Sequence, residues 1–166
     1  MTDMSEQPAP ASRRTLVAGI GNIFRGDDGF GVEVAQRLTP QALGHGVDVG
    51  DFGTRGVHLA YEIASGKYDE VILVDAAPRG GVPGTLYAIE PEIDDVTPDA
   101  ADAHSLTPAT LLAWVRRIGG GNPHVVVIGC EPGCLDESVG LSVPVTSAID
   151  GAIEMVREMV TRASRV

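Results

Sequence analysis

The sequence predicts an α/β fold in which a mostly parallel, twisted sheet of about five strands is flanked by helices on both faces. Short apolar runs rich in Val, Ile and Leu alternate along the chain with segments whose apolar residues recur at helical spacing. The strongest run, EVILVDAA (70–77), is almost continuously apolar, which is typical of a strand buried on both faces of a parallel sheet.

Five apolar runs are expected to form the strands of this sheet: 15–20, 47–52, 70–77, 84–90 and 124–129. The run 84–90 follows 70–77 after a Pro/Gly turn, so we expect the two to be neighbours, with 84–90 an antiparallel edge strand. A long acidic loop is expected over 91–106, where large apolar residues are scarce.

Four helices are expected between and after these strands, because apolar positions recur there every three or four residues. They are 31–38, 57–66, one opening at Thr107-Pro108 and one opening at Pro144. Threonine followed by proline suits the N-cap and first position of a helix. Gly66 stands where a C-cap glycine ends the second helix.

The chain of 166 residues suits a single domain, which we place at residues 14–166. Residues 1–13 are polar and rich in Pro, Ala and Ser, and are expected to form a disordered tail. No apolar run reaches the roughly 18–20 residues that span a bilayer, and the N-terminus lacks an apolar segment of signal-peptide type. A cytoplasmic protein is therefore expected.

The formal net charge of −11 argues against nucleic acid or an anionic membrane as a partner, whereas a cation or a basic peptide is compatible with it. Two cysteines, Cys130 and Cys134, stand in a chain without an export signal. We expect reduced thiols that serve as ordinary small core or loop residues.

Acidic residues gather where the predicted strands end. Asp27 and Asp28 follow the first strand, Asp51 ends the second and Asp75 ends the third, while the long loop carries His104. Because ligands of open α/β sheets bind at the carboxyl ends of the strands, we expect these side chains to lie at the functional site. Carboxylates and an imidazole from separate strand ends fit a divalent metal in a mixed oxygen and nitrogen site.

The turn GIGNIFRGDDGFG (19–31) allows other interpretations. It begins a dinucleotide fingerprint, but Phe24 stands where the third glycine belongs, and Asp27 and Asp28 would repel a pyrophosphate at the helix start. No bound nucleotide is therefore expected, although a nucleotide-binding regulator remains an alternative. The glycines would let a cation or a peptide approach the main chain. One aspartate of the pair is expected to cap the following helix.

The same turn resembles the signature of the hydrogenase maturation endopeptidases, read as G-I-G-N-x-x-x-G-D-D-G-x-G. The resemblance continues over residues 15–160 through short motifs in matching order: D-x-G-T-x-G (51–56), V-D-A (74–76), H-S-L (104–106), G-x-x-P (129–132) and G-L-S (140–142). It implies a phosphorylase/hydrolase-like twisted sheet and an aspartic-type endopeptidase. Such an enzyme trims the C-terminal extension of a [NiFe] hydrogenase large-subunit precursor and so activates the hydrogenase.

The resemblance also implies catalytic and metal-binding roles for Asp28, Asp75 and His104, which would recognise nickel already carried by the precursor. Asp27, Asp51, Gly21 and Asn22 are expected to support this trio, and Asp27 or Asp51 could act as a base. A protein that binds nickel or the precursor without cutting it, a maturation chaperone, would use the same residues and is the alternative.

Overall fold

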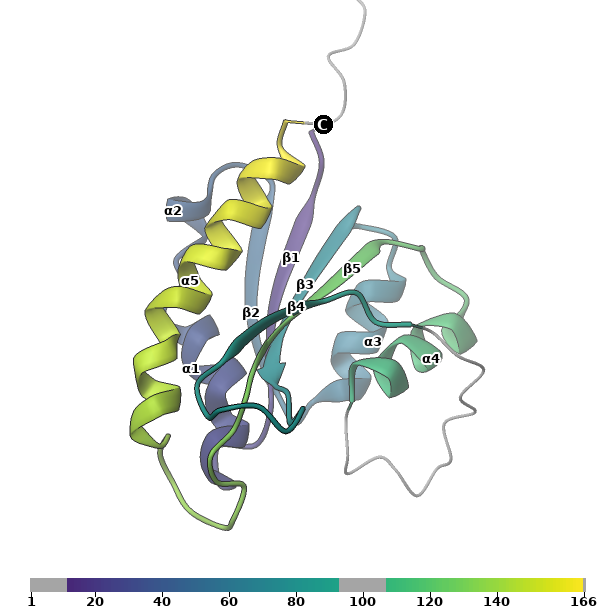
Figure 1. The fold of residues 1–166 in the computed structure, drawn as a ribbon. Helices are drawn as coiled ribbons and strands as arrows, with labels where there is room; N and C mark the ends of the chain where they lie inside the picture. The colour runs from purple at the N-terminus through teal and green to yellow at the C-terminus, as the bar shows by residue number, and fades with distance from the viewer. Residues whose placement is uncertain (1–11, 93–106, 166) are drawn as a thin grey trace, which may run out of the picture.

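The computed structural model describes residues 12–92 and 107–165, which form one five-stranded sheet with helices on both faces (Figure 1). The strand order is β2-β1-β3-β5-β4, in which β4 alone runs antiparallel to its neighbour. The strands are β1 (Thr15–Ile20), β2 (Val47–Gly53), β3 (Glu70–Ala76), β4 (Leu86–Ile89) and β5 (His124–Cys130). The expected α/β fold class is confirmed.

Helices occupy the predicted segments within one or two residues at most ends, with two short additions. They are η1 (a 3₁₀ turn, Gly26–Gly29), α1 (Phe30–Arg37), α2 (Pro40–Leu43), α3 (Gly56–Ala64), α4 (Pro108–Ile118) and α5 (Val143–Ala163). The Thr107 hydroxyl accepts the Thr110 N–H at 3.2 Å, which confirms the predicted N-cap. Gly66 has a φ of +76° just beyond α3, as a terminating glycine should.

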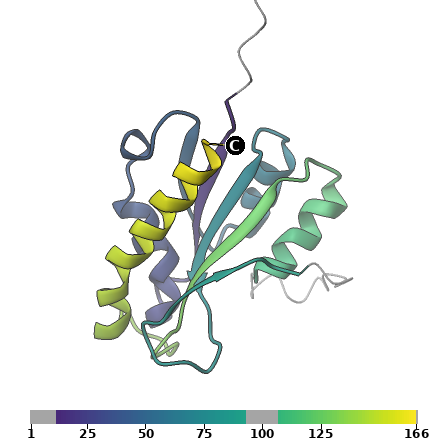
Figure 2. The ribbon, with the colours of Figure 1, turned by 45° about the horizontal axis from the view of Figure 1, so that its top comes forward.

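Two apolar layers hold the sheet between the helices. Alternate residues of β3 point to opposite faces, so Ile72 and Val74 pack with α1 and α5, whereas Val71 and Leu73 pack with α3 and α4. Figures 1 and 2 show α1 and α5 on one face and α3 and α4 on the other. Burial on both faces explains why the central strands read as continuous apolar runs.

The predicted neighbours β3 and β4 are not paired, and this expectation was wrong. Strand β5 lies between them, pairing in parallel with β3 and antiparallel with β4. The short connection after β3 therefore leaves a space between β3 and β4, and β5, which comes later in the chain, fills it. Of the expected loop and tail, residues 93–106 and 1–11 lie outside the described residues, while Arg13 already contacts Glu70 at 3.8 Å.

The sheet opens between the carboxyl ends of β1 and β3. The pairing of β1 with β3 ends at Gly19 and Val74. Strand β1 continues along β2 for one more residue, after a one-residue shift in register that pairs Ile20 with Gly53. Strand β3 continues instead along β5, so that Asp75 faces Gly129 in the register. The chain leaves the two strands in opposite directions, and this switch point is where open α/β sheets bind ligands.

Helix α1 approaches this opening so closely that glycine is required on it. A Cβ on Gly31 would overlap the Val74 carbonyl oxygen, and one on Gly19 would overlap the Gly31 carbonyl oxygen. The close neighbours of these two glycines are thus the protein's own main chain.

Replacing Gly31 with alanine is expected to lower the free energy of unfolding by about 2–3 kcal/mol, because a backbone atom cannot move aside as a flexible side chain can. Urea unfolding followed by circular dichroism measures this loss. Gly151→Ala is the control, because a Cβ on Gly151 would meet only the flexible Leu86 side chain, at 2.9 Å. Gly140→Ala would not serve, because Gly140 has a φ of +100° that strains any other residue. Equal stability of the two variants would contradict the prediction.

Candidate active-site cleft

A cleft of about 1100 Å³ occupies the opening at the carboxyl ends of the strands. It is lined by the loops that follow β1, β2 and β3 and by the first residues of α4. Asp28 and Asp75 both line it, together with Gly21 and Asn22, so four of the predicted site residues come together.

Asp75, the penultimate residue of β3, is a buried carboxyl group with 8% of its surface exposed. Burial raises the pKa of this carboxyl well above its usual range, and the nearby negative charge of Asp28 raises it further. Among the described residues, no side chain donates a hydrogen bond to the Asp75 carboxylate. A buried acid without a neutralising partner costs stability, and such a residue is typical of a functional site.

Asp28 is held beside Asp75 by the glycine turn. Its carboxylate accepts the Asn22 N–H at 2.8 Å, which closes the turn on itself. Gly21 has a φ of +132°, and a Cβ there would overlap the Asp28 carbonyl oxygen and lie 3.7 Å from Asp75 Oδ1. Only glycine permits this φ angle and this close approach to the Asp28 main chain. Gly21 and Asn22 therefore hold Asp28 in place beside Asp75.

Asp27 faces away from the cleft and joins η1 to the segment that precedes α5. Its fully buried carboxylate accepts N–H groups from Gly133 (2.7 Å), Cys134 (2.9 Å) and Ser142 (2.7 Å), and the Ser142 hydroxyl (2.8 Å). Burial acts to raise its pKa, but the hydrogen bonds from Ser142, Cys134 and Gly133 outweigh this, so the pKa lies below its usual value.

Neither aspartate caps the helix that follows, so that expectation was wrong. The N-cap of α1 is Gly29, and no side chain makes a capping hydrogen bond there. Asp27 instead binds Ser142, the N-cap residue of α5, where a negative charge also complements the helix dipole. With its oxygens occupied by these donors, Asp27 is a structural support and not a free base.

The other sequence candidates lie elsewhere. Asp51 is exposed and accepts a hydrogen bond from Gln36 Nε2 at 3.1 Å, and it does not line the cleft. His104 lies outside the described residues. Within residues 12–92 and 107–165, no three His, Cys, Asp or Glu side chains gather as a metal-binding cluster. The described part of the predicted trio is thus the pair Asp28 and Asp75.

Three polar residues of this region received no role from the sequence. Arg25 and Arg79 line the cleft, so its walls carry positive charge although its floor is acidic. Glu131, buried after β5, accepts the N–H groups of Arg79 (2.8 Å) and Gly80 (3.1 Å) and the Tyr87 hydroxyl (2.9 Å). Burial tends to raise the pKa of Glu131, but these hydrogen bonds hold it below its usual value. Glu131 thereby anchors the loop that carries Arg79.

The cysteines take the roles expected of them. Cys130 is a buried core residue and Cys134 an exposed loop residue, and both thiols are free. Burial raises the pKa of Cys130 to about 11, so this thiol stays protonated near neutral pH.

Comparison with known proteins decides the family. A family model described as hydrogenase maturation protease matches residues 32–159. The chain belongs to the hydrogenase maturation protease family. It is 30% identical over 146 residues to the hydrogenase 2 maturation protease of Escherichia coli, a match that covers 86% of this chain and 88% of that protein.

Solved structures agree with this membership. The hydrogenase maturating endopeptidase HybD of E. coli superposes with a TM-score of 0.68 at 27% identity, covering 90% of this chain and 93% of that one. The hydrogenase 2 maturation peptidase of Thaumarchaeota archaeon SCGC_AB-539-E09 gives a TM-score of 0.67 at 33% identity, covering 89% and 98%. This member of the hydrogenase maturation protease family is therefore a peptidase, as the sequence motifs predicted.

None of the helices within residues 12–92 and 107–165 is long and apolar enough to cross a bilayer.

Proposed function

We propose that this peptidase removes the C-terminal extension from the large-subunit precursor of a [NiFe] hydrogenase after nickel insertion. Asp28, Asp75 and His104 would contact the nickel that the precursor carries. The observation that supports this most strongly is the pair of acids in the cleft, of which Asp75 is buried and receives no side-chain hydrogen bond from the described residues. The alternative from the sequence, a chaperone that holds the precursor uncut, would use the same pair.

The charge of the cleft floor favours a cation as part of the substrate. Asp75 is buried and lies near the negative charge of Asp28, so its ionisation is opposed by both effects. A cation placed between two such carboxylates offsets the repulsion and the burial. Nickel held by the precursor would deliver that charge only when insertion is complete, which gives cleavage a means of checking the metal.

The start of α4 is consistent with a third ligand. Thr107 and Pro108, which open α4, line the cleft. His104 precedes Thr107 by three residues, and three residues of chain span at most about 11 Å. Two carboxylates and one imidazole would supply three protein ligands and leave positions for groups of the precursor.

The remaining residues act by holding these groups in place. The Asn22 N–H fixes the Asp28 carboxylate, and Gly21 allows it to lie beside Asp75. Arg25 and Arg79 line the same cleft and are available for carbonyl or carboxylate oxygens of the precursor chain. The cytoplasmic location expected from the sequence stays a prediction.

Incubating the protein with a nickel-loaded large-subunit precursor is expected to yield a shorter large subunit and a released C-terminal peptide. Mass spectrometry of both products measures the cut and its position. The same precursor prepared without nickel is the control and should stay intact. A stable complex with the uncut nickel-loaded precursor would contradict the proposed hydrolysis and favour the chaperone.

A further inference from the structure

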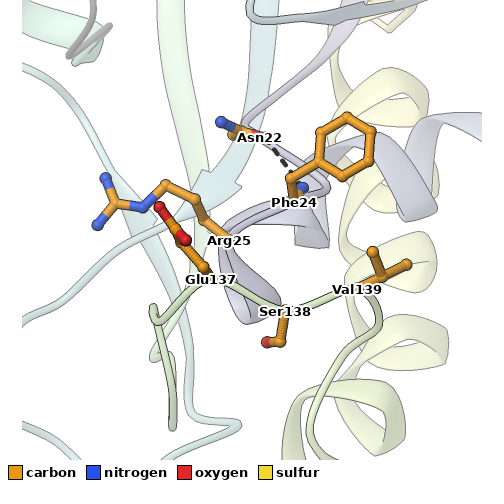
Figure 3. Close-up of a pocket in the computed structure, with 6 residues that line it drawn as sticks. All are labelled: Asn22, Phe24, Arg25, Glu137, Ser138 and Val139. Carbon is orange, nitrogen blue, oxygen red and sulfur yellow. Dashed lines mark hydrogen bonds between the residues drawn. The ribbon is translucent and has the colours of Figure 1, made fainter.

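Exposed apolar side chains lie on a surface ledge beside the cleft. The ledge consists of Ile23–Arg25 and Glu137–Val139, which lie side by side (Figure 3). Phe24 is 64% exposed and Val139 is 77% exposed, although both are large and apolar. In Figure 3 these two side chains lie on one side of the ledge, and those of Arg25 and Glu137 lie on the other.

The ledge is held firmly by its main chain. Ser138 donates its N–H to the Phe24 carbonyl at 3.0 Å, and Gly26 donates its N–H to the Ser138 carbonyl at 2.8 Å. Asn22 Oδ1 accepts the Phe24 N–H at 2.9 Å, which holds the segment that joins the glycine turn to the ledge. A surface ordered before binding loses less entropy when a partner docks on it.

The ledge is continuous with the cleft. A hollow of about 430 Å³ lies on it, and two residues that line this hollow, Asn22 and Arg25, also line the cleft. Asn22 donates its N–H to Asp28, so the ledge adjoins the residue proposed to contact the nickel. Asn22 and Arg25 therefore connect the cleft with the hollow, which Phe24 and Val139 also line.

We propose that the ledge binds an extended segment of the precursor next to the bond that is cut, through a large apolar side chain placed against Phe24 and Val139. This inference rests on the proposed function and adds a preference for an apolar residue near the cleavage site. A second copy of the chain is a poorer occupant, since a stable interface buries about 800 Å² of each partner. Three exposed apolar side chains, Ile23 included, supply little of that area.

The test compares Phe24→Ala and Val139→Ser with matched controls, Tyr61→Ala and Val57→Ser. The control side chains are 62% and 51% exposed on α3 and line neither the cleft nor the hollow. Processing of the nickel-loaded precursor is followed by mass spectrometry over a range of precursor concentrations. We expect each ledge variant to raise KM by about three- to tenfold with kcat unchanged, the pattern of a binding contact made equally before and during reaction.

Substitution of the precursor identifies the side chain that docks. Each large apolar residue within about six positions of the cut is replaced by serine, and one replacement should raise KM for the wild-type enzyme but not for Phe24→Ala. Additive effects at every position would overturn the proposal, as would ledge variants that behave like the controls. So would a change from dimer to monomer in Phe24→Ala without a change in KM. If the wild-type enzyme cuts no precursor, the proposed function itself fails.

Discussion

Replacing Asp75 with asparagine is expected to raise the melting temperature of the metal-free protein while nearly abolishing processing. The buried carboxyl resists ionisation because of its burial and the charge of Asp28, and asparagine keeps its shape without the charge. A gain of about 1 kcal/mol corresponds to roughly 2–4 °C in a domain of this size. Processing should fall at least about 100-fold, because a group proposed to contact nickel is lost.

The gain in stability from Asp75→Asn should depend on pH. Folding raises the pKa of Asp75 above its ordinary value of 3.8. Below that pH the carboxyl is protonated in both states and costs the wild-type protein nothing. As the pH rises from 3.8 toward the pKa of the folded protein, the free energy of unfolding of the wild type falls. The difference between variant and wild type should therefore be largest at neutral pH and disappear near pH 4.

Calorimetry in the presence of a chelator measures this difference, and mass spectrometry of the precursor measures processing. Asp150→Asn, which removes an exposed carboxylate from α5, is the matched control and should change neither quantity. Asp28→Asn and His104→Ala should reduce processing as Asp75→Asn does. Wild-type processing by all three variants would contradict their proposed roles.

Replacing Asp27 with alanine is expected to destabilise the protein by about 3 kcal/mol or more, although Asp27 does not face the cleft. Three main-chain N–H groups, those of Gly133, Cys134 and Ser142, and one hydroxyl would lose a charged acceptor. Such a loss lowers the melting temperature by roughly 6–12 °C. Processing should fall as well, since the neighbouring Asp28 would no longer be held in place.

The effect of Asp27→Ala has the opposite pH dependence. Because folding lowers the pKa of Asp27 below 3.8, its stabilisation is complete above that pH and is lost as the pH falls through the folded value. The two proteins should therefore differ most above about pH 5 and converge in strong acid. Ser142→Ala removes only the hydroxyl donor and should cost about 1 kcal/mol. If Asp27→Ala were no worse than Ser142→Ala, the bridging role would be refuted.

The local sequence pattern was sufficient to predict the positions of most helices and strands. The central strands are buried on both faces, so their residues are apolar without interruption, and periodicity located them within one or two residues. Thr107-Pro108 predicted the start of α4 because an N-cap depends only on neighbouring residues. The order of strands could not be predicted this way, since the pairing of β4 with β5 depends on contacts between distant segments.

The sequence by itself determined the fold class and the family motifs, and its resemblance to the family proposed Asp28 and Asp75 as acids of the site. Asp75 also follows from position, because a carboxylate at the carboxyl end of a buried parallel strand lies at the edge of the sheet where ligands bind. Only the tertiary structure decided between the adjacent acids of the glycine turn. Asp28 faces the cleft, whereas Asp27 turns to the start of α5, more than 100 residues later in the chain. Such a contact depends on how α5 packs against the sheet, and no local pattern records it.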